Sequence, residues 1–221
     1  MIVKNNPKEL LFHQIETLYG GGGYDKDLIH NAYPIVLDKL ENCFLHIRNK
    51  YYSKQNEAFF NPLHVAQYTM FLYDMSREIS TSGNYDLCDE IYGISKMISS
   101  ADIFYGVNMP DIWFFDHPQG SVIGRASYGN YFSFSQGCTV GNNKGKYPVL
   151  GKHVSMLSNS KVLGDCHVGN HVIFSANSYI IDTDIPPYSI VFGQYPDISI
   201  KSIAPEKFQE LTSSMFDSYD E

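Results

Sequence analysis

Asp116 and His117 stand side by side just before a stretch with an unusual repeat, and this position is the first sign of chemistry in the chain. A histidine changes charge near neutral pH, so it can take a proton from a hydroxyl group and later return it. A regular coil offers no polar interior that would need a histidine, so His117 at its flank is a candidate catalytic residue. Asp116 beside it is a residue type that is typical of turns.

The repeat has a period of six residues, in two runs separated by a four-residue insertion. Its strided positions are Val122, Tyr128, Phe134, Val140, Leu150, Met156, Val162, Val168, Phe174 and Ile180. Helices and single strands have periods of 3.6 and 2, whereas a coil with three flat faces of six residues each explains this one. We expect the strided side chains to point inward. Two positions before them, small or β-branched residues should fill the corners: Val154, Ser160, Cys166, Val172 and Ser178. Two prolines, Pro186 and Pro187, should end the pattern, because proline has no N–H to donate.

The first half has helical signals instead. Pro7, Pro34 and Pro62 can each begin a helix, and Asp86 can cap a fourth. The glycines at 20–23 lack the Lys-Ser/Thr of a phosphate-binding loop and are interpreted as a linker. The sequence thus predicts a helical domain at 1–100, a coil domain at 101–200 and a polar, partly frayed tail at 201–221.

The composition excludes several classes of protein. The chain has 16 Lys and Arg against 24 Asp and Glu, a net charge of −8, which disfavours binding to nucleic acid or an anionic membrane. No apolar segment has the length of a membrane span or the form of a signal peptide, so a cytoplasmic location is expected. The four scattered cysteines form no C-x-x-C pair and are expected to be reduced and buried.

Several motifs in order resemble the serine acetyltransferase branch of the hexapeptide-repeat acyltransferases. They are Asp102-Ile103, Asp116-His117, Gln136-Gly137-Cys138-Thr139-Val140-Gly141, Tyr147-Pro148-Val149-Leu150-Gly151 and Pro186-Pro187. The resemblance covers roughly residues 60 to 200. It implies an α+β fold, with an N-terminal helical bundle followed by a left-handed parallel β-helix. It also implies a homotrimer or a dimer of trimers, with active sites between neighbouring copies.

The resemblance also implies roles for individual residues. His117 would be the base, Asp102 would orient its ring, and Asp116 would contact the acceptor. Backbone N–H groups near Gly141 would stabilise the oxyanion. The co-substrate acetyl-CoA would contact Asn142, Asn143, Ser158, Ala176 and Lys201.

The chain departs from the family on the acceptor side. Lys146-Tyr147 stands where serine acetyltransferases carry Arg-His, and the loop before this pair is four residues shorter than usual. A lysine neutralises a carboxylate but lacks the bidentate fork of arginine. A sugar hydroxyl therefore becomes a rival to serine as acceptor. The chain also lacks the terminal isoleucine with which some serine acetyltransferases bind their sulfhydrylase, so no cysteine-synthase complex is expected.

Two alternatives carry other functions. A γ-class carbonic anhydrase would use a zinc site, and His117 and His153 are 36 residues apart, but a third ligand is missing where Ser158 stands. A non-catalytic scaffold would keep the coil and lose activity. The sequence favours a metal-free, acetyl-CoA-dependent O-acetyltransferase. Its acceptor would be a small molecule, either a sugar hydroxyl in surface-polysaccharide synthesis or L-serine.

Overall fold

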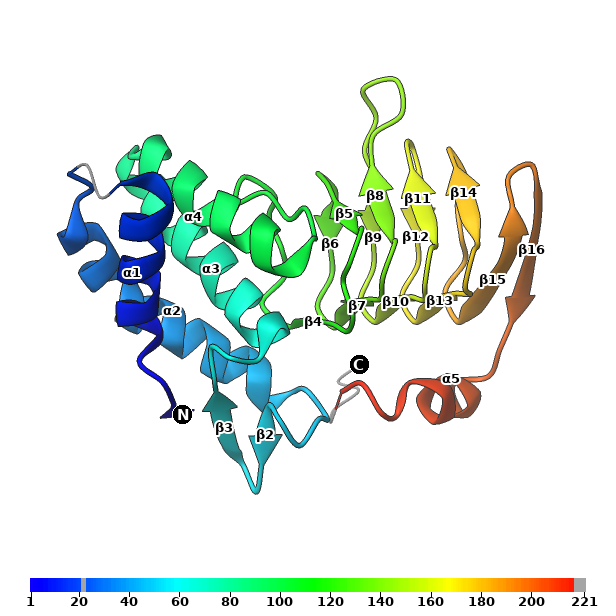
Figure 1. Cartoon of the computed structure of the whole chain (residues 1–221). Coiled ribbons are helices and arrows are strands. Elements are labelled where there is room, and N and C mark those ends of the chain that lie inside the picture. Colours follow the sequence, from blue (N-terminus) through cyan, green and yellow to red (C-terminus); the bar gives the residue numbers. More distant parts are fainter. Residues whose placement is uncertain (21–22, 217–221) are drawn as a thin grey trace.

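The computed structural model describes residues 1–20 and 23–216, as a helical part followed by a coil (Figure 1). The helices of the first part are α1 (Pro7–Tyr19), α2 (Lys26–Leu45), α3 (Val65–Ile79) and α4 (Tyr85–Ser99), with a 3₁₀ turn at Ser80–Ser82. Helix α3 packs against α2 and α4, and α1 packs against α4. None of the helices in the described residues is both long and apolar enough to cross a membrane. Gly21 and Gly22 of the predicted linker lie outside the described residues.

Two of these helices begin at residues other than the predicted ones. Helix α2 starts at Lys26, because the Asp25 side chain caps it by accepting a backbone hydrogen bond at 2.9 Å. Pro34, the predicted first residue, therefore lies inside the helix. Helix α4 is capped by Asn84 and not by Asp86. Proline was the stronger signal in the sequence, but a capping side chain upstream determined where α2 begins.

A small sheet that the sequence did not predict lies beside these helices. Strand β1 (Ile2–Val3) pairs in parallel with β3 (Glu57–Phe60), which pairs antiparallel with β2 (Ser53–Lys54). These strands are too short for a period to be recognised. Helix α3 follows, and its cap is His64, two residues beyond the predicted start at Pro62.

The second half is the predicted triangular coil of parallel strands. One face holds β4 (Trp113–Phe115), β7 (Phe132–Phe134), β10 (Val154–Met156), β13 (Val172–Phe174) and β15 (Ser189–Gln194). A second face holds β5 (Val122–Ile123), β8 (Thr139–Gly141), β11 (Lys161–Leu163) and β14 (Tyr179–Ile181). The third holds β6 (Ser127–Tyr128), β9 (Val149–Leu150) and β12 (His167–Val168). The predicted fold class, a helical bundle followed by a left-handed parallel β-helix, is confirmed.

Each strand places one apolar side chain above the equivalent residue of the previous turn. One such stack consists of Phe115, Phe134, Met156, Phe174 and Val191. The corner residues predicted to be small or β-branched are fully buried. The prediction for Val122 was wrong, because it is 44% exposed and Ile123, at 1%, is the inward residue. The first turn is one residue short, and a shift of one residue exchanges the two faces of a strand.

The coil continues past the two prolines that were predicted to end it. Residues 189–191 of β15 pair in parallel with β13, so Val191 covers Phe174. Pro187 lies at a corner between strands, where no N–H is needed for the ladder. The coil ends instead where β15 turns back into an antiparallel partner, β16 (Asp197–Ser202).

Beyond β16 the chain does not fray as predicted but forms α5 (Pro205–Thr212), which runs back beneath the coil (Figure 1). Phe208 of α5 is 1% exposed and packs edge-on against the rings of His171 and Tyr188, with centroid distances of 5.1 and 6.4 Å. One buried aromatic ring therefore anchors a helix whose other residues are mostly polar. Residues 217–221, with the chain end used in the prediction about a sulfhydrylase partner, lie outside the described residues.

Candidate functional site

His117 lies in the turn that links β4 to β5 at one corner of the coil. Its backbone φ is +49°, in the left-handed region that residues other than glycine rarely adopt, and its side chain is 77% exposed. Two backbone hydrogen bonds fix the turn. The Gly120 N–H donates to the Ser100 carbonyl at 2.8 Å, and the Gly137 N–H donates to the Gln119 carbonyl at 3.0 Å. The imidazole thus projects into solvent from a fixed support, as a base that must meet a substrate requires.

The Asp102 carboxylate, predicted to orient the His117 ring, is held by α4. The Tyr92 hydroxyl donates a hydrogen bond to Oδ1 of Asp102, and Lys96 Nζ lies 2.9 Å from Oδ2. Asp102 pairs through its backbone with β5, so it belongs to the same first turn of the coil as His117. Within the described residues no hydrogen bond joins Asp102 to His117, whose Nε2 lies 3.6 Å from Asp116 Oδ1. The role of Asp102 therefore stays a prediction.

The His117 corner continues as a straight edge through the later turns, at residues 135–138, 157–160 and 175–178. Ser158 and Ala176 lie on this edge, in register with each other, since the Asn177 N–H donates to the Ser158 carbonyl at 2.8 Å. Both side chains are small, and Ala176 is exposed. Two of the predicted contacts for CoA are therefore on the same edge of the coil as His117.

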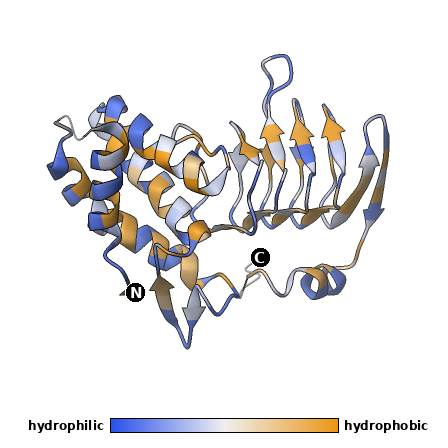
Figure 2. Ribbon diagram, in the orientation of Figure 1, coloured by the Kyte–Doolittle hydropathy of each residue, from blue (hydrophilic) through white to orange (hydrophobic). Residues whose placement is uncertain are grey.

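The four-residue insertion forms a hairpin loop that projects from a different corner, between β8 and β9 (Figure 1). Asn143 and Lys146 exchange backbone hydrogen bonds of 3.1 and 2.9 Å, and Lys144 and Gly145 at the tip have φ of +49° and +79°. Positive φ at both central residues is typical of a tight type I′ hairpin turn. The Asn143 side chain donates to Asp182 Oδ2 at 2.7 Å, which ties the loop to the coil. Figure 2 shows that the loop is hydrophilic.

Apart from Asp116, which lies beside His117, the residues predicted to serve the acceptor and the oxyanion belong to this loop and not to the His117 corner. Lys146 Nζ lies 3.8 Å from Asp165 Oδ2, and Tyr147 is 41% exposed. Gly141 and Asn142 form the base of the loop on the same corner. Lys201 is exposed on β16, at the opposite end of the coil from β4 (Figure 1). One chain alone therefore does not bring the two predicted halves of the site together.

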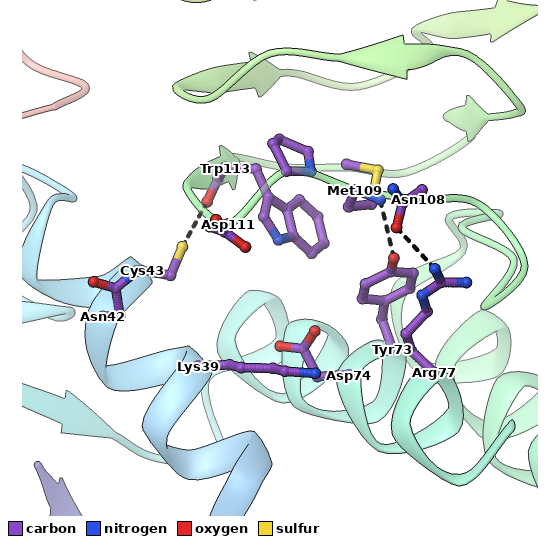
Figure 3. A pocket seen from close by; sticks show the side chains of 11 residues that line it. Lys39, Asn42, Cys43, Tyr73, Asp74, Arg77, Asn108, Met109, Asp111 and Trp113 are labelled. Carbon is purple, nitrogen blue, oxygen red and sulfur yellow. Dashed lines mark hydrogen bonds between the residues drawn. The ribbon is translucent and has the colours of Figure 1, made fainter. Parts of the chain in front are cut away.

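A separate cavity of about 160 Å³ lies where the helices meet the start of the coil (Figure 3). Asp74 of α3 and Asp111 of the segment before β4 both contribute to its lining. No hydrogen bond from a described residue reaches the Asp74 carboxylate, and Figure 3 draws none there. Burial raises the pKa of Asp74 to about 7, Lys39 opposes this, and the negative charges of Glu78 and Asp111 add to it. Asp74 is therefore a pH-sensitive group outside the His117 corner.

Replacing Asp74 with asparagine is expected to flatten the pH dependence of stability. A carboxyl group whose pKa is raised in the folded state stabilises that state below its unfolded pKa, and loses this contribution as pH rises through about 7. Between pH 5 and pH 8, the unfolding free energy of wild type should fall by on the order of 2 kcal/mol more than that of the variant. This value allows for the partial exposure of the Asp74 side chain. Urea unfolding at both pH values measures this. The exposed Asp38→Asn is the control, and equal pH dependence in wild type and Asp74→Asn would contradict the prediction.

The histidine considered for a zinc site has a structural environment instead. His153 is 2% exposed and lies parallel to the Tyr131 ring at 4.2 Å and to the His171 ring at 4.8 Å. It occupies a different corner of the coil from His117. Within residues 1–20 and 23–216, no three His, Cys, Asp or Glu side chains are grouped so that they could hold a metal ion. All four cysteines are buried and form no disulfide.

Tyr92 and Lys96, which hold Asp102, were not predicted from the sequence. They are four residues apart, so they share one face of α4. Which acidic group they meet depends on how the chain reverses between α4 and the coil, and no local pattern encodes that reversal. A tyrosine and a lysine four residues apart, near the end of a helix that leads into the Asp102 motif, are the signal that was present.

Comparison with known proteins finds serine acetyltransferases among the chains that are similar to this one. No protein-family model matches the chain. Over 124 residues the chain is 29% identical to a serine acetyltransferase of Staphylococcus aureus (strain Mu50). That match covers 54% of this chain and 58% of the relative, so the chain spans less than two thirds of the relative's length.

Solved structures extend the likeness to the whole fold. A serine acetyltransferase in complex with cysteine matches with a TM-score of 0.73 and 20% identity, over 92% of this chain and 81% of that one. A serine acetyltransferase in complex with CoA matches with a TM-score of 0.68 and 19% identity, over 88% and 83%. At this identity the structures establish the fold, and the sequence match adds the likeness to one branch. The chain is therefore serine acetyltransferase-like in sequence and has the left-handed β-helix fold of the hexapeptide-repeat acyltransferases.

Proposed function

We propose that the chain is an acetyl-CoA-dependent O-acetyltransferase in which His117 is the catalytic base. The observation that carries this proposal is the His117 corner, where an exposed imidazole on a fixed turn heads an edge of small residues. Two comparisons support it. The relatives similar in sequence are serine acetyltransferases, and one structure of the same fold is a complex with CoA.

The proposed reaction needs one base and one leaving group. His117 accepts the proton of the acceptor hydroxyl while the oxygen forms a bond to the thioester carbonyl carbon. The carbon–sulfur bond then breaks, and His117 returns the proton to the sulfur, so the products are an acetyl ester and free CoA. Asp102 has lone pairs left beyond those used by Tyr92 and Lys96, so it can also accept a hydrogen bond from the ring. Hydrogen bonds of this kind often tighten only when substrate is bound.

Acetyl-CoA would lie along the His117 corner. The small side chains of Ser158 and Ala176 leave room there for an extended pantetheine arm, and Lys201 would meet phosphate groups near the far end. Backbone groups at Gly141, Asn142 and Asn143 would contact the thioester end and stabilise the oxyanion.

Because these last three residues lie at another corner, we propose that the site forms between copies of the chain. The loop of one copy would meet the His117 corner of the next, in a homotrimer or a pair of trimers. A closed ring of identical contacts supplies such a site at every interface.

For the acceptor we favour a sugar hydroxyl, as in surface-polysaccharide synthesis, over L-serine. Lys146 and Tyr147 stand where serine acetyltransferases place Arg and His, and Lys146 already faces Asp165. A single ammonium group binds a free amino-acid carboxylate less specifically than a guanidinium group, which can form two parallel hydrogen bonds to it. Serine acetylation for cysteine synthesis is the second candidate, because the similar sequences are named for that activity.

The acceptor is tested by thiol release from acetyl-CoA in the presence of serine, homoserine, free sugars and nucleotide sugars. We expect release that depends on a sugar and exceeds release with serine by at least about tenfold, roughly 1.4 kcal/mol in barrier height. Much faster turnover of serine than of every sugar would contradict the sugar proposal. No release with any hydroxyl compound would favour a non-catalytic scaffold.

A further inference from the structure

A cavity of about 250 Å³ lies between the β2–β3 hairpin and the start of α3. Lys4, Lys50 and Lys54 all contribute to its lining, and no Asp or Glu is among the described residues that line it. All three lysines are exposed, and none forms an ion pair within the described part of the chain. In a chain with net charge −8, three unpaired lysines around one cavity form a local positive field.

The walls of this cavity are held in place by buried contacts. Gln67 is 1% exposed, its Nε2 donates to the Tyr51 carbonyl at 2.7 Å, and its Oε1 accepts from the Asn61 N–H at 2.8 Å. The Tyr51 ring is 58% exposed, and Lys50 Nζ lies 5.1 Å from its centroid. His64, the cap of α3, also lines the cavity, so the positive end of the helix dipole points the same way. The cavity wall formed by Gln67, Tyr51 and Asn61 is therefore fixed, and the Tyr51 ring offers aromatic surface beside the lysine charges.

Two ring contacts connect the cavity to β4, the strand that leads into the turn of His117. The His64 ring lies 5.4 Å from the Tyr52 ring, which lies 5.6 Å from Phe114 of β4, two residues before Asp116. Burial lowers the pKa of His64, and the negative charge of Asp116 opposes that lowering. A molecule that fills the cavity could extend past Asp116 towards His117.

We infer that this lysine cavity binds the phosphate of a phosphorylated sugar, whose free hydroxyl is then acetylated at His117. The inference rests on the proposed acetyltransferase function and narrows its acceptor. Lysines bind phosphate as point charges, and the exposed Tyr51 ring offers a surface on which a sugar or a base can stack. Serine carries no second anionic group that would use these lysines. A sugar phosphate and a nucleotide-linked sugar share the required chemistry.

The test measures binding by isothermal titration calorimetry without acetyl-CoA, so that it does not depend on catalysis. The probes are glucose, glucose 1-phosphate, UDP-glucose and inorganic phosphate. The variant is Lys50→Gln/Lys54→Gln, whose exposed positions should not affect folding. The matched control is Lys26→Gln, which removes a positive charge at the far N-terminal end of α2. Circular dichroism verifies the fold of each variant.

We expect wild type and Lys26→Gln to bind at least one phosphorylated sugar and not glucose, and the double variant to bind it about tenfold more weakly. In wild type, added salt should weaken the binding. Comparable binding of glucose 1-phosphate and UDP-glucose would support a single phosphate, and binding of UDP-glucose alone would support a diphosphate. Equal binding by the double variant and the control, or no preference for phosphorylated sugars, would overturn the inference. If the inference is overturned, acetyl transfer to an unphosphorylated acceptor would still support the proposed function. Acetyl transfer that survives the loss of His117 would overturn the proposed function itself.

Discussion

Replacing His117 with alanine is expected to lower the rate of acetyl transfer by about 10²–10⁴-fold, the usual contribution of a positioned general base. The acceptor hydroxyl would then have to lose its proton to water while it attacks the thioester. The His117 side chain is 77% exposed, so its removal leaves no cavity and the fold should persist. Thiol release with a saturating acceptor measures the rate, and circular dichroism measures the fold.

The control is His167→Ala. His167 is another exposed histidine of the coil, beside a carboxylate, with Nδ1 3.2 Å from Asp184 Oδ1. His167 belongs to β12 on the third face of the coil and has no assigned role in the proposed site, so its loss should leave transfer nearly unchanged. The assignment of His117 as base fails if the two variants retain similar activity.

Replacing Gly129 with alanine is expected to destabilise the coil by about 3 kcal/mol or more. A Cβ at Gly129 would lie 2.5 Å from the Gly151 carbonyl carbon and 2.6 Å from the Lys152 nitrogen. Both atoms are backbone of the next turn, which cannot move without shifting the whole stack. The melting temperature should fall by roughly 10 °C, given the usual scaling for a chain of this length.

A matched substitution separates this clash from a general effect of adding a methyl group. Gly141 is also in the coil, and a Cβ there would meet only Leu163 Cδ2, at 3.7 Å. Gly141→Ala should therefore melt within a few degrees of wild type, as monitored by circular dichroism. Similar melting temperatures for the two variants would show that the turns are not packed as tightly as described.

The coil was predictable because its signal is repeated many times in the sequence. Every turn of the coil requires one inward residue in six and small residues at the corners, so the same pattern recurs from turn to turn. The prediction failed for Val122, where a short first turn shifted the register, and at Pro187, where a corner needs no N–H donor. Each of these departures affects a single position, and a repeating pattern does not predict where a single position departs from it.

The candidate site was less predictable, because its parts come from segments that meet only in three dimensions. His117, Ser158 and Ala176, which the family resemblance assigned to one site, fall on one edge of the coil. The hydrogen bonds of Asp102 to Tyr92 and Lys96 depend on how α4 packs against the coil, which no period records. The lysine cavity depends on three strands of two to four residues, whose pairing has no sequence signature.

The most direct test of a site shared between copies mixes two variants that are each expected to be inactive. One is His117→Ala, and the other replaces residues 142–147 with two glycines, which removes the loop. In co-refolded mixed assemblies, the His117 corner of the second variant can meet the loop of the first. With random mixing, about one quarter of the sites should be intact, and a corresponding fraction of the thiol-release activity should return. Mixed assemblies that form, as shown by mass spectrometry, yet stay inactive would contradict a site built from the His117 corner of one copy and the loop of another.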